Sequence, residues 1–284
     1  MKLVITDGAW GTELQKRGLA PGACPDEWNL SFPERVAEVA RAYVDAGSEV
    51  ILTNTFRASP VALEAAGLGR HMRDINRAGV RISRQAADGR ARVFASLGPS
   101  GKLLPAEEIT EEQAFACFAA QAEALAAESP DALLLETFAD LAEASIALRA
   151  ARATGLPVFV AFVFDTGRQK DRTMMGVTPE QAAARMTDEG ASGVGANCGV
   201  GIEAAVTVCR RLRAATRLPL WMKPNAGLPQ MHGGELAWRS GPESFCSGAA
   251  LLAESGASYI GGCCGSDPRY IRALVEARAR GALS

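Results

Sequence analysis

The chain has 284 residues, 48% of them hydrophobic and 22% charged, and its formal net charge at pH 7 is −2. This composition is typical of a globular protein with a large core, and it offers no electrostatic footprint for nucleic acid or an anionic membrane. No apolar run approaches the roughly 20 residues that span a bilayer. Because the N-terminus reaches Asp7 too early for a secretory signal, we expect a cytoplasmic protein whose seven cysteines stay reduced.

Short apolar runs alternate with longer alanine-rich stretches along the whole chain, and this alternation predicts eight strand–helix units. Strands are predicted at 3–6, 50–53, 92–96, 132–135, 157–162, 193–196, 218–222 and 258–260. Helices are predicted at 33–46, 110–128, 141–153, 179–189, 202–215, 243–254 and 269–280, and in a broken region that ends near residue 88. Eight such units favour an α/β fold, a single (β/α)8 TIM barrel over residues 1–284.

Two connections, 165–178 and 223–242, are longer than a barrel needs. Both follow predicted strands, so both are expected on the face where enzymes of this fold carry their sites. Long loops at that face often act as lids. His232 lies in the second loop, where a surface position is expected and a contact with substrate remains open.

Polar side chains follow several predicted strands, and they would meet at the same face of the barrel. Asp7 and Gly8 follow the first strand, and Asn225 follows the seventh. Taken singly, these residues could be ordinary turn residues. Glu136 directly follows a leucine-rich strand, and it is harder to explain in this way because an unpaired buried carboxylate is costly.

Three cysteines lie at the same face. Cys198 closes the sixth predicted strand, while Cys263 and Cys264 follow the eighth. The glycines that flank this pair, two before it and Gly265 after it, would let both thiols bend inward. Three thiolates suit zinc, with one coordination position open for a substrate. The other cysteines are predicted to be structural because none ends a strand: Cys24, Cys117, Cys209 and Cys246.

An open zinc site with three thiolates indicates one kind of chemistry. Such a zinc ion would be a poor Lewis acid for making hydroxide, but it could accept a substrate thiol and displace its proton. A free thiol has a pKa near ~8.5, so coordination greatly increases the thiolate fraction. We therefore predict attack by a substrate thiolate on an alkyl group, with no catalytic side chain beyond the metal site. The alternative is a non-catalytic zinc- or thiol-binding barrel, such as a zinc store or a redox sensor.

Seven motifs carry a resemblance to a known family. They are DGAWGT at 7–12, TNTF at 53–56, GPSG at 98–101, ETF at 136–138, GANC at 195–198, PNAG at 224–227 and GGCCG at 261–265. On these motifs nearly the whole chain resembles the homocysteine S-methyltransferase family. That family includes betaine– and S-methylmethionine–homocysteine methyltransferases and the homocysteine module of cobalamin-dependent methionine synthase. The PNAG and GPSG motifs are more similar to the methionine synthase module.

The resemblance implies a zinc-bearing barrel that methylates homocysteine to methionine. By position in the motifs, Cys198, Cys263 and Cys264 would bind Zn²⁺, and Asn225 would lie near the metal and fill the open position before substrate arrives. No histidine or general base is part of this expected site.

The resemblance also implies how substrates bind. Asp7 and Glu136 would hold the amino group of homocysteine, and backbone amides near Gly8 to Gly11 could receive its carboxylate. A chain of 284 residues leaves no room for folate, cobalamin and activation modules. The expected methyl donor is therefore a separate corrinoid protein or a small sulfonium or ammonium compound. A homocysteine relative such as selenohomocysteine remains open as the acceptor.

Overall fold

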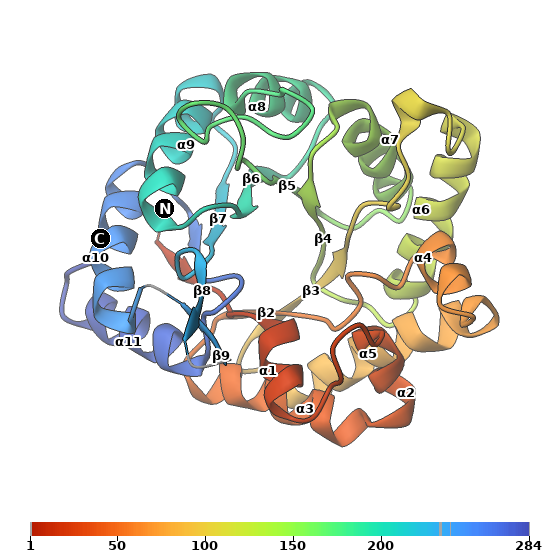
Figure 1. Cartoon of the computed structure of the whole chain (residues 1–284), viewed down its shortest axis with the longest axis horizontal. Coiled ribbons are helices and arrows are strands. Elements are labelled where there is room, and N and C mark those ends of the chain that lie inside the picture. Colours follow the sequence, from red (N-terminus) through yellow and green to blue (C-terminus); the bar gives the residue numbers. More distant parts are fainter. Residues whose placement is uncertain (1, 233–234, 239, 284) are drawn as a thin grey trace.

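The computed structural model describes residues 2–232, 235–238 and 240–283, and it shows a parallel barrel ringed by helices (Figure 1). The eight barrel strands run in the order β1-β10-β7-β6-β5-β4-β3-β2, and a parallel bridge between Thr6 and Val50 joins the two ends of this order. They are β1 (Val4–Ile5), β2 (Val50–Leu52), β3 (Arg92–Leu97), β4 (Ala132–Phe138), β5 (Val158–Phe162), β6 (Gly193–Cys198), β7 (Leu220–Pro224) and β10 (Tyr259–Ile260). The predicted (β/α)8 TIM barrel is confirmed.

The helices follow the expected alternation. They are α1 (Trp10–Lys16), α2 (Trp28–Ser31), α3 (Pro33–Asp45), α4 (Pro60–Ala65), α5 (Met72–Ala87), α6 (Glu111–Ala126), α7 (Leu141–Arg152), α8 (Pro179–Asp188), α9 (Ile202–Ala215), α10 (Pro242–Glu254) and α11 (Pro268–Ala279). Local sequence explains several starts, since Thr110 and Thr178 form capping boxes and Asp267 caps α11 ahead of Pro268. Within the described residues, no helix has the length and apolarity needed to cross a bilayer.

Two short helices and two short strands were not expected from the sequence. Helices α1 and α2 occupy the connection between the first strand and α3, and an antiparallel hairpin of β8 (Pro229–His232) and β9 (Glu235–Trp238) lies in the long loop after β7. Figure 1 shows that hairpin at the same side of the barrel as α11. The side chain of His232 lies outside the described residues.

The strand boundaries decide which residues face the barrel interior. Strand β7 begins two residues later than predicted and reaches Pro224, and β4 and β6 continue through Phe138 and Cys198. Alternate residues of a strand face the same side of the sheet. The residue two positions after an apolar side chain in the barrel interior therefore also points into the interior. That filling includes Phe94, Leu134 and Trp221, and the rings of Phe94 and Trp221 stack with centroids 5.6 Å apart. Two residues further along these strands lie Ser96, Glu136 and Lys223.

Gly195 allows β6 to lie close to β7. A Cβ atom at this position would lie 1.8 Å from the backbone oxygen of Trp221, and backbone cannot move aside as a flexible side chain can. We expect Gly195→Ala to lower the free energy of unfolding by about 1–3 kcal/mol, as overpacking of a core does. Chemical denaturation of the reduced protein measures this change. Gly241→Ala, whose Cβ would meet nothing within 4 Å, is the control, and equal unfolding midpoints in both variants would contradict the prediction.

Candidate functional site

The structure brings the three predicted ligand cysteines together. Cys198 is the last residue of β6, while Cys263 and Cys264 lie three and four residues after β10, and their Sγ atoms all lie within 4.8 Å of one another. The Sγ atoms of Cys198 and Cys263 are 3.0 Å apart. Cys198 has a positive φ of 59°, an uncommon backbone conformation for a residue other than glycine. Such strain at the end of a strand is typical of residues held in place for a function.

The donor set fits a zinc ion. A tetrahedral ion with zinc–sulfur distances of ~2.3 Å separates its sulfur ligands by about 3.8 Å, and the three Sγ atoms here all lie within 4.8 Å of one another. Asn225 adds a second observation, because its Nδ2 donates to Gly199 O at 2.6 Å whereas its buried Oδ1 has no hydrogen-bond partner in the described structure. An orphaned amide oxygen on the residue after β7 is compatible with a fourth, exchangeable ligand.

Close packing explains the two glycines before the cysteine pair. A Cβ atom at Gly261 would lie 2.0 Å from Oγ1 of Thr6, and one at Gly262 would lie 2.2 Å from Oγ of Ser266. Neither of these two glycines has a positive φ, so they supply room, whereas Gly265 after the pair has a φ of 83° and supplies the backbone freedom expected of the flanking glycines. The backbone N–H of Cys263 donates to Pro224 O at 2.8 Å, which joins the cysteine loop to the end of β7.

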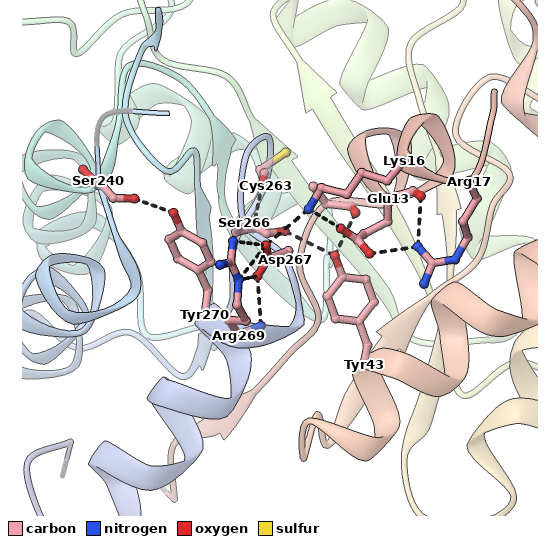
Figure 2. Close-up of polar contacts among 11 residues, drawn as sticks. Glu13, Lys16, Arg17, Tyr43, Ser240, Cys263, Ser266, Asp267, Arg269 and Tyr270 are labelled. Atoms are coloured by element: carbon pink, nitrogen blue, oxygen red, sulfur yellow. Dashed lines mark hydrogen bonds and ion pairs between the residues drawn. The ribbon is translucent and has the colours of Figure 1, made fainter. Parts of the chain in front are cut away.

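A polar network of residues from α1, α3 and the start of α11 supports the loop that carries Cys263 and Cys264 (Figure 2). The hydroxyl of Ser266 donates to Cys263 O at 2.6 Å, and the Tyr43 hydroxyl donates to Ser266 O at 3.2 Å. Lys16 on α1 lies 2.8 Å from Glu13 and 3.2 Å from Asp267, the N-cap of α11. The helices on either side of the loop are therefore tied to each other, which limits its movement.

The three thiols line a cavity of about 210 Å³. This volume is below the roughly 300–1,000 Å³ of sites for drug-sized ligands, and it suits a small metabolite. Glu136 lies in the same cavity, is only 8% exposed, and accepts a hydrogen bond from the Ser96 hydroxyl. Burial raises the pKa of Glu136 to about 7, against the opposing effect of the Lys223 charge.

Asp7 occupies a more enclosed position than expected. Its carboxylate is fully buried and has three protein donors: Lys223 pairs with Oδ1, while Trp10 Nε1 and Leu52 N each donate to Oδ2 at 2.7 Å. The described lining of the cavity includes Gly8 and Lys223 but not Asp7. A substrate ammonium could therefore reach Glu136 directly, and it could reach Asp7 only by displacing Lys223.

Asn197, the neighbour of Cys198, fixes the strand that carries Glu136. Its Oδ1 accepts from Thr137 N at 2.8 Å, and its Nδ2 donates to Thr137 Oγ1 at 2.6 Å. Thr137 has a φ of 67°, and the pairing of β4 with β5 shifts at this point. The amide of Asn197 thus holds an irregular strand end through a contact that spans 60 positions in the sequence.

The other candidates are dispersed. Cys117 and Cys209 are buried in α6 and α9, and Cys24 and Cys246 lie apart from the cluster of Cys198, Cys263 and Cys264. The loop 165–178 is closed on itself by an antiparallel bridge between Thr166 and Arg172. A lid function for either long loop stays a prediction.

Sequence reasoning placed Ser96 and Asn197 at strand ends on this face without giving them a role, and it missed Lys223. Lys223 lay just beyond the predicted end of the seventh strand, so it was assigned to a loop. Extending the apolar run by one residue would have placed Lys223 on the same face of the strand as Trp221, two positions earlier.

Comparisons with known proteins agree with this geometry. A family model described as homocysteine S-methyltransferase matches residues 4–278. The chain is 32% identical to betaine–homocysteine S-methyltransferase 1 of Mus musculus, covering 97% of this chain and 72% of that protein. It is 30% identical to methionine synthase of Mycobacterium leprae (strain TN), covering 98% of this chain but 24% of that protein. The chain thus spans about a quarter of the methionine synthases that it matches.

The solved structures add a likeness of fold. The metallated form of the homocysteine methyltransferase MmuM from Escherichia coli matches with a TM-score of 0.82 and 24% identity, covering 98% of this chain and 96% of that one. Its apo form matches with a TM-score of 0.76.

Proposed function

Because this chain belongs to the homocysteine S-methyltransferase family, we propose that it transfers a methyl group to the thiol of homocysteine and releases methionine. The observation that carries this activity is the shared cavity. It holds three thiols at one side and a buried carboxylate, Glu136, with an ammonium, Lys223, among the remaining lining residues. A small amino acid with a thiol offers matching groups.

We propose Cys198, Cys263 and Cys264 as the ligands of one Zn²⁺ ion, with Asn225 near the exchangeable position. A bound zinc ion would supply a coordination position for the homocysteine sulfur and favour its thiolate form over the thiol. The residues behind the ligands keep them in place: Ser266 holds the loop of Cys263, and Asn197 holds the neighbouring strand end.

Glu136 is proposed to receive the substrate ammonium. The Ser96 hydroxyl donates to one oxygen of this carboxylate, which orients the side chain at the end of β4. Asp7 is proposed to support the same site by holding Lys223 and not by touching the substrate, since its carboxylate already has three hydrogen-bond donors. The amide of Ala9 donates to Ser266 O at 2.9 Å, so of the amides near Gly8 to Gly11 this one has a partner already.

The reaction needs alignment more than proton transfer by a side chain. The thiol proton is lost to solvent when homocysteine binds. The thiolate sulfur then forms a bond to the methyl carbon while the bond between methyl and donor breaks, and the electron pair of the broken bond leaves with the donor. A sulfonium donor then departs as a thioether, an ammonium donor as a tertiary amine, and a methyl-corrinoid as the reduced corrinoid. A cavity that holds sulfur, ammonium and donor in line can supply much of the rate increase.

The test is a direct assay. Reduced, zinc-loaded protein is incubated with homocysteine and each of three donors: S-methylmethionine, betaine, and a methyl-corrinoid. We expect methionine with one donor class, and about 10- to 100-fold slower formation with Glu136→Gln at subsaturating homocysteine. A protein that binds zinc but neither binds homocysteine nor forms methionine would instead support a zinc store or a redox sensor.

A further inference from the structure

Lys223 is a cation inside the proposed substrate cavity. It faces the barrel interior two residues beyond Trp221, it is 2% exposed, and it lines the same cavity as Glu136 and the three ligand cysteines. Arg57 is the other basic residue of this lining, and it is exposed. Lysine is rarely fully buried unless it is paired, because removing a charge from water is costly.

The protein satisfies only part of the hydrogen-bonding capacity of this ammonium. A lysine ammonium has three N–H donors. Within the described part of the chain, the one hydrogen bond of Lys223 Nζ goes to Oδ1 of Asp7. The remaining donors lie on a buried atom that borders a cavity, where an anionic oxygen would be their natural partner.

Asp7 fixes the position of this ammonium. Trp10 and Leu52 hold the other oxygen of the carboxylate at 2.7 Å each, so the carboxylate cannot rotate without losing them. Because Lys223 Nζ pairs with this fixed carboxylate, its ammonium is held in place at the border of the cavity.

Glu136 completes a pair of opposite charges. It lines the same cavity as Lys223, and no ion pair joins the two side chains among the described residues. A ligand that carries both an ammonium and a carboxylate would offer a partner to each of these side chains.

We propose that Lys223 binds the α-carboxylate of the amino-acid substrate while Glu136 binds its α-ammonium. This assignment rests on the proposed function and deepens it, because it makes Lys223 a residue that determines specificity. It replaces backbone amides near Gly8 with a buried cation as the principal partner of the carboxylate. The cavity then selects zwitterionic amino-acid thiols over simple thiols and over aminothiols that lack a carboxylate.

Ligands that lack one group at a time test the proposal without any mutation. The zinc-loaded protein is titrated with homocysteine, with 3-mercaptopropylamine, which lacks the carboxylate, and with 4-mercaptobutanoate, which lacks the ammonium. A lost charge-assisted hydrogen bond lowers affinity by about 10- to 100-fold. We expect both analogues to bind more weakly than homocysteine by factors in that range.

Variants then assign each group. Lys223→Met should weaken homocysteine by about 10- to 100-fold and leave 3-mercaptopropylamine nearly unchanged. Glu136→Gln, the matched control, should weaken both of these ligands and spare 4-mercaptobutanoate. Because Lys223→Met leaves Asp7 buried without its cation and could unfold the protein, the double variant Asp7→Asn/Lys223→Met removes both charges and should show the same ligand pattern.

The outcomes separate the two proposals. If wild-type protein binds homocysteine and 3-mercaptopropylamine equally well, or if the double variant still prefers homocysteine by the same factor, Lys223 does not bind the carboxylate and the methyltransferase assignment stands. If wild-type protein binds none of the three thiols at its zinc, the proposed function itself is wrong.

Discussion

Alanine at Cys198, Cys263 or Cys264, one position at a time, is expected to reduce bound zinc from one ion per chain to near zero after dialysis. The three Sγ atoms within 4.8 Å of one another are the only such cluster of metal-ligating side chains in the described structure. Two remaining thiolates cannot enclose an ion that requires at least three protein ligands. Methionine formation should fall further than the roughly 10- to 100-fold typical of changes outside the ligand shell.

Metal analysis of purified, reduced protein measures this effect. Cys117→Ala is the matched control because Cys117 is buried in α6, away from the cluster. Equal zinc retention in Cys117→Ala and in all three ligand variants would show that the metal binds elsewhere. Retention in Cys198→Ala alone would limit the ligands to the Cys263–Cys264 loop.

Glu136→Gln is expected to stabilise the metal-free, substrate-free protein at alkaline pH. Burial raises the pKa of Glu136 from 4.5 to about 7, so the native state binds this proton more tightly than the unfolded chain does. The contribution to stability is present in full below pH 4.5 and is lost as pH rises through about 7. A pKa shift of this size corresponds to about 3 kcal/mol of folding stability. Wild-type protein loses this stability at alkaline pH, whereas the glutamine variant has no carboxyl group to titrate and keeps it.

Urea denaturation from pH 5 to pH 8, with reductant and chelator present, tests this prediction. The free energy of unfolding of Glu136→Gln minus that of wild type should increase through this window and level off above pH 7. Glu34→Gln, which removes a carboxylate that is 87% exposed, corrects for the general loss of surface charge. A difference between Glu136→Gln and wild type that stays constant across the window would contradict a raised pKa.

Much of the architecture followed from local patterns. The run 132–135 is continuously apolar, as a parallel strand buried on both faces must be, and the helix at 202–215 was predicted with the boundaries of α9. The cysteines could be grouped because in a parallel barrel the carboxyl ends of all strands meet at one face. Spacing in the sequence is sufficient for such conclusions, since periodicity depends only on the geometry of a helix or a strand.

The ends of the strands could not be read in this way. A strand ends where its last backbone partner ends, so β7 continues through Lys223 because β6 lies beside it as far as Cys198. The apolar run ends at Met222, so the sequence pattern placed Lys223 in a loop. In the structure Lys223 pairs with Asn197 on β6, and this register places its side chain inside the barrel, since a shift of one residue would exchange the interior and exterior faces of the strand.

The chain's own pattern determined the barrel, the face that carries the site and the cysteines that lie there. Only the tertiary structure decided the partners of the charged groups. Asp7 was expected to meet a substrate directly, but Lys223, 216 residues away in the sequence, occupies its carboxylate, and Trp10 and Leu52 complete its shell. A buried charge must be matched by whichever opposite charge the fold brings nearest, and that choice depends on contacts between distant strands that no local pattern encodes.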